Sequence, residues 1–207
     1  MRTLSVAAVL AALTTFVTAL ALRAADATMA VLAVAALAVL VTWIAGAHTT
    51  DEESGLALTS PAAVVALTLV GRRSPTMFLP LIAAQVLGAV IGGFAALGLD
   101  DKLGDTLVFT QPGLVVAGVV TGVLAVIGAW VLFAIDGEVH EAYAAVPPVL
   151  TGAMLPLGMV TALNPAAMLG VATAGLVPWD VALTASGAAL IGAAVGAYTM
   201  SLLSPEE

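Results

Sequence analysis

The sequence predicts an all-α integral membrane protein: a single domain, 1–207, with six transmembrane helices and two re-entrant half-helices in an inverted repeat. Hydrophobic residues make up 62% of the chain and charged residues 9%, whereas soluble domains average about 25% charged residues. The charged residues fall between or beyond the long apolar runs. Each half of the chain also contains one short apolar segment that begins with a capping residue and a proline. Paired short segments of this kind point to a site near the bilayer midplane.

Three apolar runs in the first half are long enough to span a bilayer, which needs about 20 apolar residues. They are residues 4–22, 29–47 and 75–99. Between the last two, the uncharged run 54–70 is broken by Ser, Gly, Thr and Pro. This pattern favours a re-entrant loop followed by a half-helix from Pro61, because irregular backbone at membrane depth is tolerated only where it lines a cavity.

The second half repeats this order. Its predicted spans are 112–135, 147–160 and 181–203, with a half-helix from Pro165 before the last of them. Because each half contains an odd number of spans, the half 106–207 starts on the side of the membrane opposite to the half 1–105. Glycines on the spans supply small faces for close helix packing.

The first apolar run has one alternative interpretation. Arg2, the run 4–22 and Ala25-Asp26-Ala27 also fit a secretory signal peptide with a small-residue cleavage site. We favour a span, because the run is longer than the usual core of about 7–15 residues. Cleavage would also leave the first half one helix short.

Each half-helix begins with a strong helix-start signal. Ser60-Pro61 and Asn164-Pro165 place a capping side chain before a proline at the first helical position, where the missing N–H costs nothing. The segment after Pro165 covers only about two turns before Gly175 and Pro178, too short to cross a bilayer. In an inverted repeat, the two capped N-termini meet at the midplane.

These residues resemble the aquaporin (major intrinsic protein) family. Asn164-Pro165-Ala166 looks like the family's second signature tripeptide. Ser60-Pro61-Ala62 is similar to the first, with serine in place of the family's asparagine. The turn 71–74 is similar to the family's Gly-Arg turn, and residues 84–89 and 192–198 to its third and sixth helices. The likeness covers nearly the whole chain.

The resemblance implies an aquaporin-like passive channel for water and small neutral solutes, with one pore in each subunit of a homotetramer. Each half-helix N-terminus carries about half a positive charge, so their junction would oppose cations and protons. Asn164 has two N–H donors and Ser60 has one O–H, so each can cap its helix and also orient a solute passing in single file. The alternative for both residues is a cap alone.

The family's outer selectivity filter falls, by offset, on four positions: Val34, Gly152, Thr161 and Ala167. Most family members have an arginine at the last of these. The small residues Gly152 and Ala167 therefore imply a wider, less charged constriction, which favours glycerol-class solutes alongside water. For Gly152 and Thr161, ordinary helix packing is the alternative.

The chain also departs from the family at a pair of buried glutamates. Ala11 and Ala117 stand at these positions, four residues before Thr15 and Thr121. Either other groups satisfy the loop amides that those carboxylates would brace, or the loops are less rigid. Gln85, in the middle of the third span, is interpreted as an interhelical contact rather than as a pore residue.

Other classes of function have little support. His48 and His140 lie in loops without a partner at metal-ligand spacing, and the chain has no cysteine. We therefore expect no enzyme activity, no metal and no cofactor. A net charge of -8 argues against nucleic-acid binding. Two alternatives stay open: a secondary carrier, although no buried carboxylate offers an ion site, and a non-conducting aquaporin-like protein.

The basic residues give a weak orientation signal. With a cytoplasmic N-terminus, Arg2, Arg72 and Arg73 lie inside, and Arg23 and Lys102 lie outside. We expect a multi-pass protein of the plasma membrane with both termini cytoplasmic. The acidic loops with a single lysine suggest a halophilic, archaeal source.

Overall fold

The computed structural model describes residues 2–23, 27–99, 102, 112–135 and 163–203, and the regular structure in these ranges is helical. Within them, five helices are long and apolar enough to cross a membrane. These are α1 (Arg2–Ala21), α2 (Ala27–Gly46), α4 (Phe78–Leu97), α5 (Leu114–Ile135) and α8 (Trp179–Leu203). The predicted span 147–160 lies outside the described residues.

The predicted spans agree with these helices to within a few residues. The main difference is at the third span, where Pro75–Met77 forms a separate 3₁₀ turn, η2, before α4 begins at Phe78. The helix then ends at Leu97, with Gly98 as its C-cap. Proline is well tolerated in a first helical turn, where its missing N–H would have no partner.

Two short helices occupy the predicted half-helix positions. They are α3 (Pro61–Leu69) and α7 (Pro165–Thr173), each of nine residues. At about 1.5 Å per residue, each spans less than half of the roughly 30 Å hydrocarbon core. A 3₁₀ turn, η1 (Gly55–Leu58), leads into α3.

The two half-helices also end in the same way. Gly71 and Gly175 have φ angles of 76° and 75°, a left-handed conformation that glycine adopts without a steric penalty. After each glycine the chain closes a Schellman motif: the N–H of Arg72 donates to Leu67 O at 2.8 Å, and that of Leu176 donates to Val171 O at 3.2 Å. One sequence offset therefore relates both the caps and the ends of α3 and α7.

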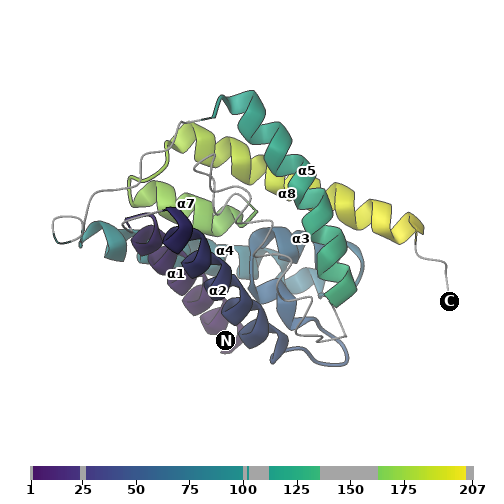
Figure 1. The fold of residues 1–207 in the computed structure, drawn as a ribbon. Helices are drawn as coiled ribbons and strands as arrows, with labels where there is room; N and C mark the ends of the chain where they lie inside the picture. Colours follow the sequence, from purple (N-terminus) through teal and green to yellow (C-terminus); the bar gives the residue numbers. More distant parts are fainter. Residues whose placement is uncertain (1, 24–26, 100–101, 103–111, 136–162, 204–207) are drawn as a thin grey trace.

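The described helices pack in matching pairs (Figure 1). Helix α1 lies along α4, and α5 lies along α8. Each half-helix crosses to the last span of the other half, so that α7 packs on α4 and α3 packs on α8. This exchange is the arrangement expected of an inverted repeat.

Glycines allow the paired spans to come close together. A side chain at Gly88 or Gly92 of α4 would collide with the backbone of α1, at Ala8 or Ala12. On the opposite pair, a side chain at Gly192 of α8 would collide with the carbonyl of Gly122 in α5. Small residues let helix backbones approach in this way, which strengthens packing inside a bilayer.

Gly170 should be the most sensitive position of half-helix α7. A Cβ added there would lie 2.5 Å from both Ala89 O of α4 and Thr15 Cγ2 of α1. We expect Gly170→Ala to lower the free energy of unfolding by about 1–3 kcal/mol, because overpacking forces a backbone shift. Thermal unfolding in detergent measures this.

Gly187→Ala is the matched control, because a Cβ at Gly187 of α8 meets nothing within 4 Å in the part of the chain that the structure describes. Replacing a glycine inside a helix by alanine should there be neutral or stabilise by up to about 1 kcal/mol. An equal melting temperature for the two variants would contradict the packing described for α7.

Candidate functional site

The N-termini of α3 and α7 are both capped by the residue before the proline. Ser60 Oγ accepts from the backbone N–H of Ala63 at 3.1 Å, and Asn164 Oδ1 accepts from that of Ala167 at 3.3 Å. Ser60 and Asn164 have extended backbones, and a proline follows each at the first helical position. The local signals Ser-Pro and Asn-Pro thus produce the capping expected of them.

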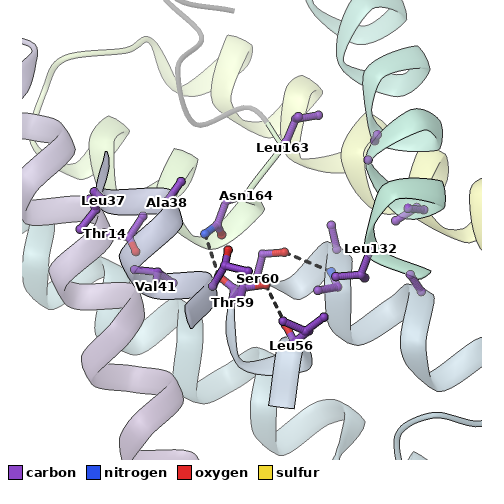
Figure 2. Close-up of a pocket in the computed structure, with 18 of the residues that line it drawn as sticks. Thr14, Leu37, Ala38, Val41, Leu56, Thr59, Ser60, Leu132, Leu163 and Asn164 are labelled. Atoms are coloured by element: carbon purple, nitrogen blue, oxygen red, sulfur yellow. Dashed lines mark hydrogen bonds between the residues drawn. The ribbon is translucent and has the colours of Figure 1, made fainter. Parts of the chain in front are cut away.

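A hydrogen bond joins the two half-helices at their N-terminal ends. Asn164 Nδ2 donates to the carbonyl oxygen of Thr59, 105 positions earlier in the chain, at 3.0 Å (Figure 2). The Thr59 hydroxyl in turn donates to Leu56 O at 2.8 Å. The Asn164 side chain therefore caps α7 and also binds the carbonyl of the residue before the cap of α3. This brings the two positive helix ends together.

A cavity of about 160 Å³ lies against this junction. Its walls come from α1, α2, the η1–α3 segment, α5, α8 and residues 163–164. No charged side chain is among the described residues that line it, and its polar side chains are Thr14, Thr18, Thr42, Thr59, Ser60 and Asn164. A water molecule needs only about 10–15 Å³ by a comparable measure, so the cavity is large enough for several water molecules.

The residues predicted from the sequence fall into three groups. Those that line the cavity are Ser60, Ala62, Asn164 and Val34, the predicted second-helix filter position. Those that are buried and are not among the lining residues are Pro61, Pro165, Ala166 and Ala167. Gly152 and Thr161 lie outside the described residues. Ala167 contributes its backbone N–H to the cap of α7, while its side chain is fully buried.

The two positions that lack a glutamate are filled by close packing. Ala11 of α1 is 2% exposed and lies in one cluster with Ala89 of α4 and Ala166 of α7. Ala117 of α5 is fully buried. Neighbouring helices therefore pack against these alanines and leave little room for a longer side chain. Other groups must hold the loop before α3.

Short polar side chains satisfy the amides of that loop. The N–H of Leu56 donates to Ser54 Oγ at 3.2 Å, and the N–H of Gly55 donates to Thr49 Oγ1 at 3.0 Å. Gln85 of α4, fully buried, donates from Nε2 to the carbonyl of Ala57 at 2.9 Å. Gln85 is not among the lining residues, which fits its interpretation as a packing contact rather than a pore residue.

Arg73 is a structural residue that the sequence reasoning missed. Its side chain is only 4% exposed, although it lies between the apolar runs, in the turn after α3. Nη1 donates to Ser54 O at 3.2 Å, and Nη2 lies 3.2 Å from Glu53 Oε2. Ser54 N–H also donates to Arg72 O at 2.9 Å. The chain entering η1 is thereby fastened to the chain leaving α3.

A signal for this clamp was present in the sequence. Two adjacent arginines directly follow Gly71 in a chain that has only five lysines and arginines in all. An arginine beside a tight turn can reach several backbone carbonyls, because its guanidinium carries five donors in a fixed plane. The sequence did not indicate which carbonyl it would meet.

The arrangement matches a solved channel structure. The X-ray structure of the aquaglyceroporin from Plasmodium falciparum superposes with a TM-score of 0.71, over 95% of this chain and 93% of that chain, at 16% sequence identity. The fold is that of an aquaporin. No protein-family model matches the sequence, and no curated protein matches it.

The aquaporin fold explains why the loop before α3 forms so many side-chain hydrogen bonds. A loop that re-enters the membrane finds no water there for its backbone groups, so the loop before α3 has to satisfy them within the protein. In the described loop before α3, serine, threonine, glutamine and arginine side chains do this. They hold Ser60 at the junction without a buried carboxylate from α1.

Arg73→Met should loosen this loop. The substitution keeps an unbranched apolar side chain but removes the donor to Ser54 O, and leaving a buried acceptor unsatisfied costs about 1–3 kcal/mol. We expect a lower melting temperature in detergent and faster protease cleavage between Ala47 and Ser54. Glu53→Gln serves as the control, because it keeps the Arg73–Ser54 bond and an amide oxygen that can still accept from Nη2, and removes only the charge of the partly exposed Glu53 carboxylate. Equal effects of both variants would assign the clamp to the ion pair instead.

Proposed function

We propose that the protein is a passive channel for water and small neutral solutes. The observation that carries the proposal is the junction itself: two half-helix N-termini, tied by the Asn164–Thr59 hydrogen bond, beside a cavity whose described lining bears no charge. Helix dipoles at this point favour anions and oppose cations. An anion would lose its hydration shell in a cavity with no cationic side chain among its described lining, whereas neutral molecules that form hydrogen bonds meet neither barrier.

Polar groups in the cavity suit single-file passage. Asn164 uses one N–H on Thr59 O and has a second to offer, while Ser60 has one O–H. Carbonyl and threonine oxygens nearby accept hydrogen bonds in return. A solute that gives and takes hydrogen bonds, such as water or a small polyol, can therefore replace the bonds that it leaves behind in bulk water.

The solute class we propose includes glycerol. An arginine at position 167 would narrow an outer filter and add charge, and Ala167 supplies neither. Together with Gly152, Thr161 and Val34 as the other filter positions, this favours a constriction wide enough for glycerol-class solutes. The proposal would be wrong if water crosses and glycerol does not.

The setting of the channel is part of the same proposal. We infer one membrane domain, 1–207, made of the halves 1–105 and 106–207, in the plasma membrane with both termini cytoplasmic. We further infer a homotetramer with one pore per subunit. The acidic, lysine-poor connections support a halophilic archaeal source, so assays belong at high salt.

Flux through proteoliposomes tests the function directly. Under a sucrose gradient at high salt, stopped-flow light scattering should show vesicle shrinkage several-fold faster than in empty liposomes. Under a glycerol gradient, fast re-swelling should follow. Flux that saturates and depends on an ion gradient would instead indicate a secondary carrier. A rate equal to that of empty liposomes in both gradients would indicate a non-conducting protein.

Asn164→Asp tests the electropositive junction. The carboxylate can still cap α7 but brings a full negative charge to the two helix ends. A unit charge acting over about 4 Å contributes about 4 kcal/mol at an effective dielectric constant of about 20. We therefore expect proton or cation leak at least about tenfold above that of the parent, measured with a pH-sensitive dye inside the vesicles.

Asn164→Ser is the matched neutral control, because it reproduces the cap found at position 60. It also removes the donor to Thr59 O, so it separates loss of the hydrogen bond from gain of charge. Its leak should stay close to that of the parent. If both variants leak equally, the barrier depends on the structure of the junction and not on its charge.

A further inference from the structure

Two glycines on the paired spans, Gly128 of α5 and Gly187 of α8, differ from those at the close helix contacts. Gly88, Gly92, Gly192 and Gly196 each face a neighbouring helix so closely that a Cβ would collide with it. A Cβ built at Gly128, inside α5, meets no atom of the described residues within 4 Å. Glycine in a helix interior is less stable than alanine. Neither close packing nor helix stability therefore accounts for a glycine at this position.

Gly128 lies on the face of α5 that borders the cavity. Ala125, Gly128, Ala129 and Leu132 all line it, at the three- and four-residue spacing that places side chains on one face of a helix. The open space beside Gly128 is therefore the cavity. A side chain there would project into the space that a solute occupies.

The neighbouring turn shows what a side chain does on this wall. Leu132, one turn further along α5, packs against two clusters of buried residues, one that includes Leu37 and Val41 of α2 and one that includes Ala62 and Ala66 of α3. Figure 2 shows Leu132 reaching from α5 toward Ser60. At Gly128 the same face of the helix has no side chain, so the wall is set back there by the depth of one side chain.

We propose that Gly128 sets the width of the solute that the cavity admits. The α5 wall is apolar at this level and would contact the carbon face of a small polyol, while Thr59, Ser60 and Asn164 offer hydrogen bonds in the same cavity. The ligand class is thus a neutral, glycerol-sized polyol or a similarly narrow polar molecule. The inference rests on the proposed function, but it places size selection on α5 and not on the outer filter positions.

Flux through graded variants tests the role in selection. Gly128→Ala, Gly128→Leu and Gly128→Phe should lower the ratio of glycerol to water permeability in that order, by at least fivefold for leucine. Water should be reduced last, because it needs the least width. Gly187→Leu is the matched control, since Gly187 of α8 also has open space around its Cβ position but is not among the lining residues. Its permeability ratio should equal that of the parent.

Thiol labelling tests the position of residue 128 without any need for conduction. The chain has no cysteine, so Gly128→Cys introduces a single thiol. We expect it to react with the water-soluble reagent 2-aminoethyl methanethiosulfonate in proteoliposomes, as measured by intact mass spectrometry, and glycerol should slow the reaction. Val123→Cys, on an exposed part of the same helix, should react far more slowly because it faces lipid.

The two assays separate failure of the inference from failure of the proposed function. If the parent conducts and Gly128→Leu keeps the parent ratio of glycerol to water permeability, the inference is wrong and the channel stands. If the parent does not conduct, the proposed function is wrong, and labelling then decides the inference. A reactive thiol protected by glycerol supports admission of the solute at residue 128. A thiol that is unreactive, or that glycerol does not protect, overturns it.

Discussion

The hydrogen bond from Asn164 Nδ2 to Thr59 O is the contact on which the rest of the structure depends. Two helix N-termini that face each other present like partial charges and free N–H groups in a medium where water cannot reach all of them. Asn164 satisfies groups at both ends, because its side-chain oxygen accepts from a free N–H of α7 and its side-chain nitrogen donates to the Thr59 carbonyl before α3. The cavity beside the junction, whose described lining bears no charge, lies where this hydrogen bond holds the two ends.

The surrounding helices support this contact through packing that glycine makes possible. Each half-helix packs on the last span of the other half as well as on that of its own half, so both halves help to position it. Gly93 and Gly170 bring α4 and α7 together at their backbones, where any side chain would collide. Buried alanines, Ala11 of α1 and Ala117 of α5, stand where a carboxylate brace would otherwise fit. Arg73 and Gln85 instead hold the loop before α3.

Sequence reasoning predicted the features that are encoded locally. The spans follow from apolar runs bounded by charge, and the half-helices follow from Ser60-Pro61 and Asn164-Pro165, whose capping needs only neighbouring residues. The contacts between distant segments were not predictable in this way. Nothing local tells that Arg73 meets Ser54 O or that Gln85 meets Ala57 O, because both depend on where the loop lies in three dimensions. Likewise, a glycine pattern on α5 does not reveal that Gly128 faces the cavity while Gly122 faces α8.

Serine at position 60 and asparagine at position 164 make the junction unequal. An asparagine has an oxygen for its own helix and a nitrogen for its neighbour, whereas Ser60 has one oxygen, which accepts from Ala63, and one proton. Of the two capping side chains, only that of Asn164 therefore forms the hydrogen bond that joins the two half-helices. A proton on Ser60 that need not hold the opposite loop can turn toward a solute, and a hydroxyl rotates more freely than a planar amide. In the channel we propose, orientation of a passing molecule would then rest mainly on Asn164, and we expect this junction to tolerate solutes of more varied shape than one with two fixed amides.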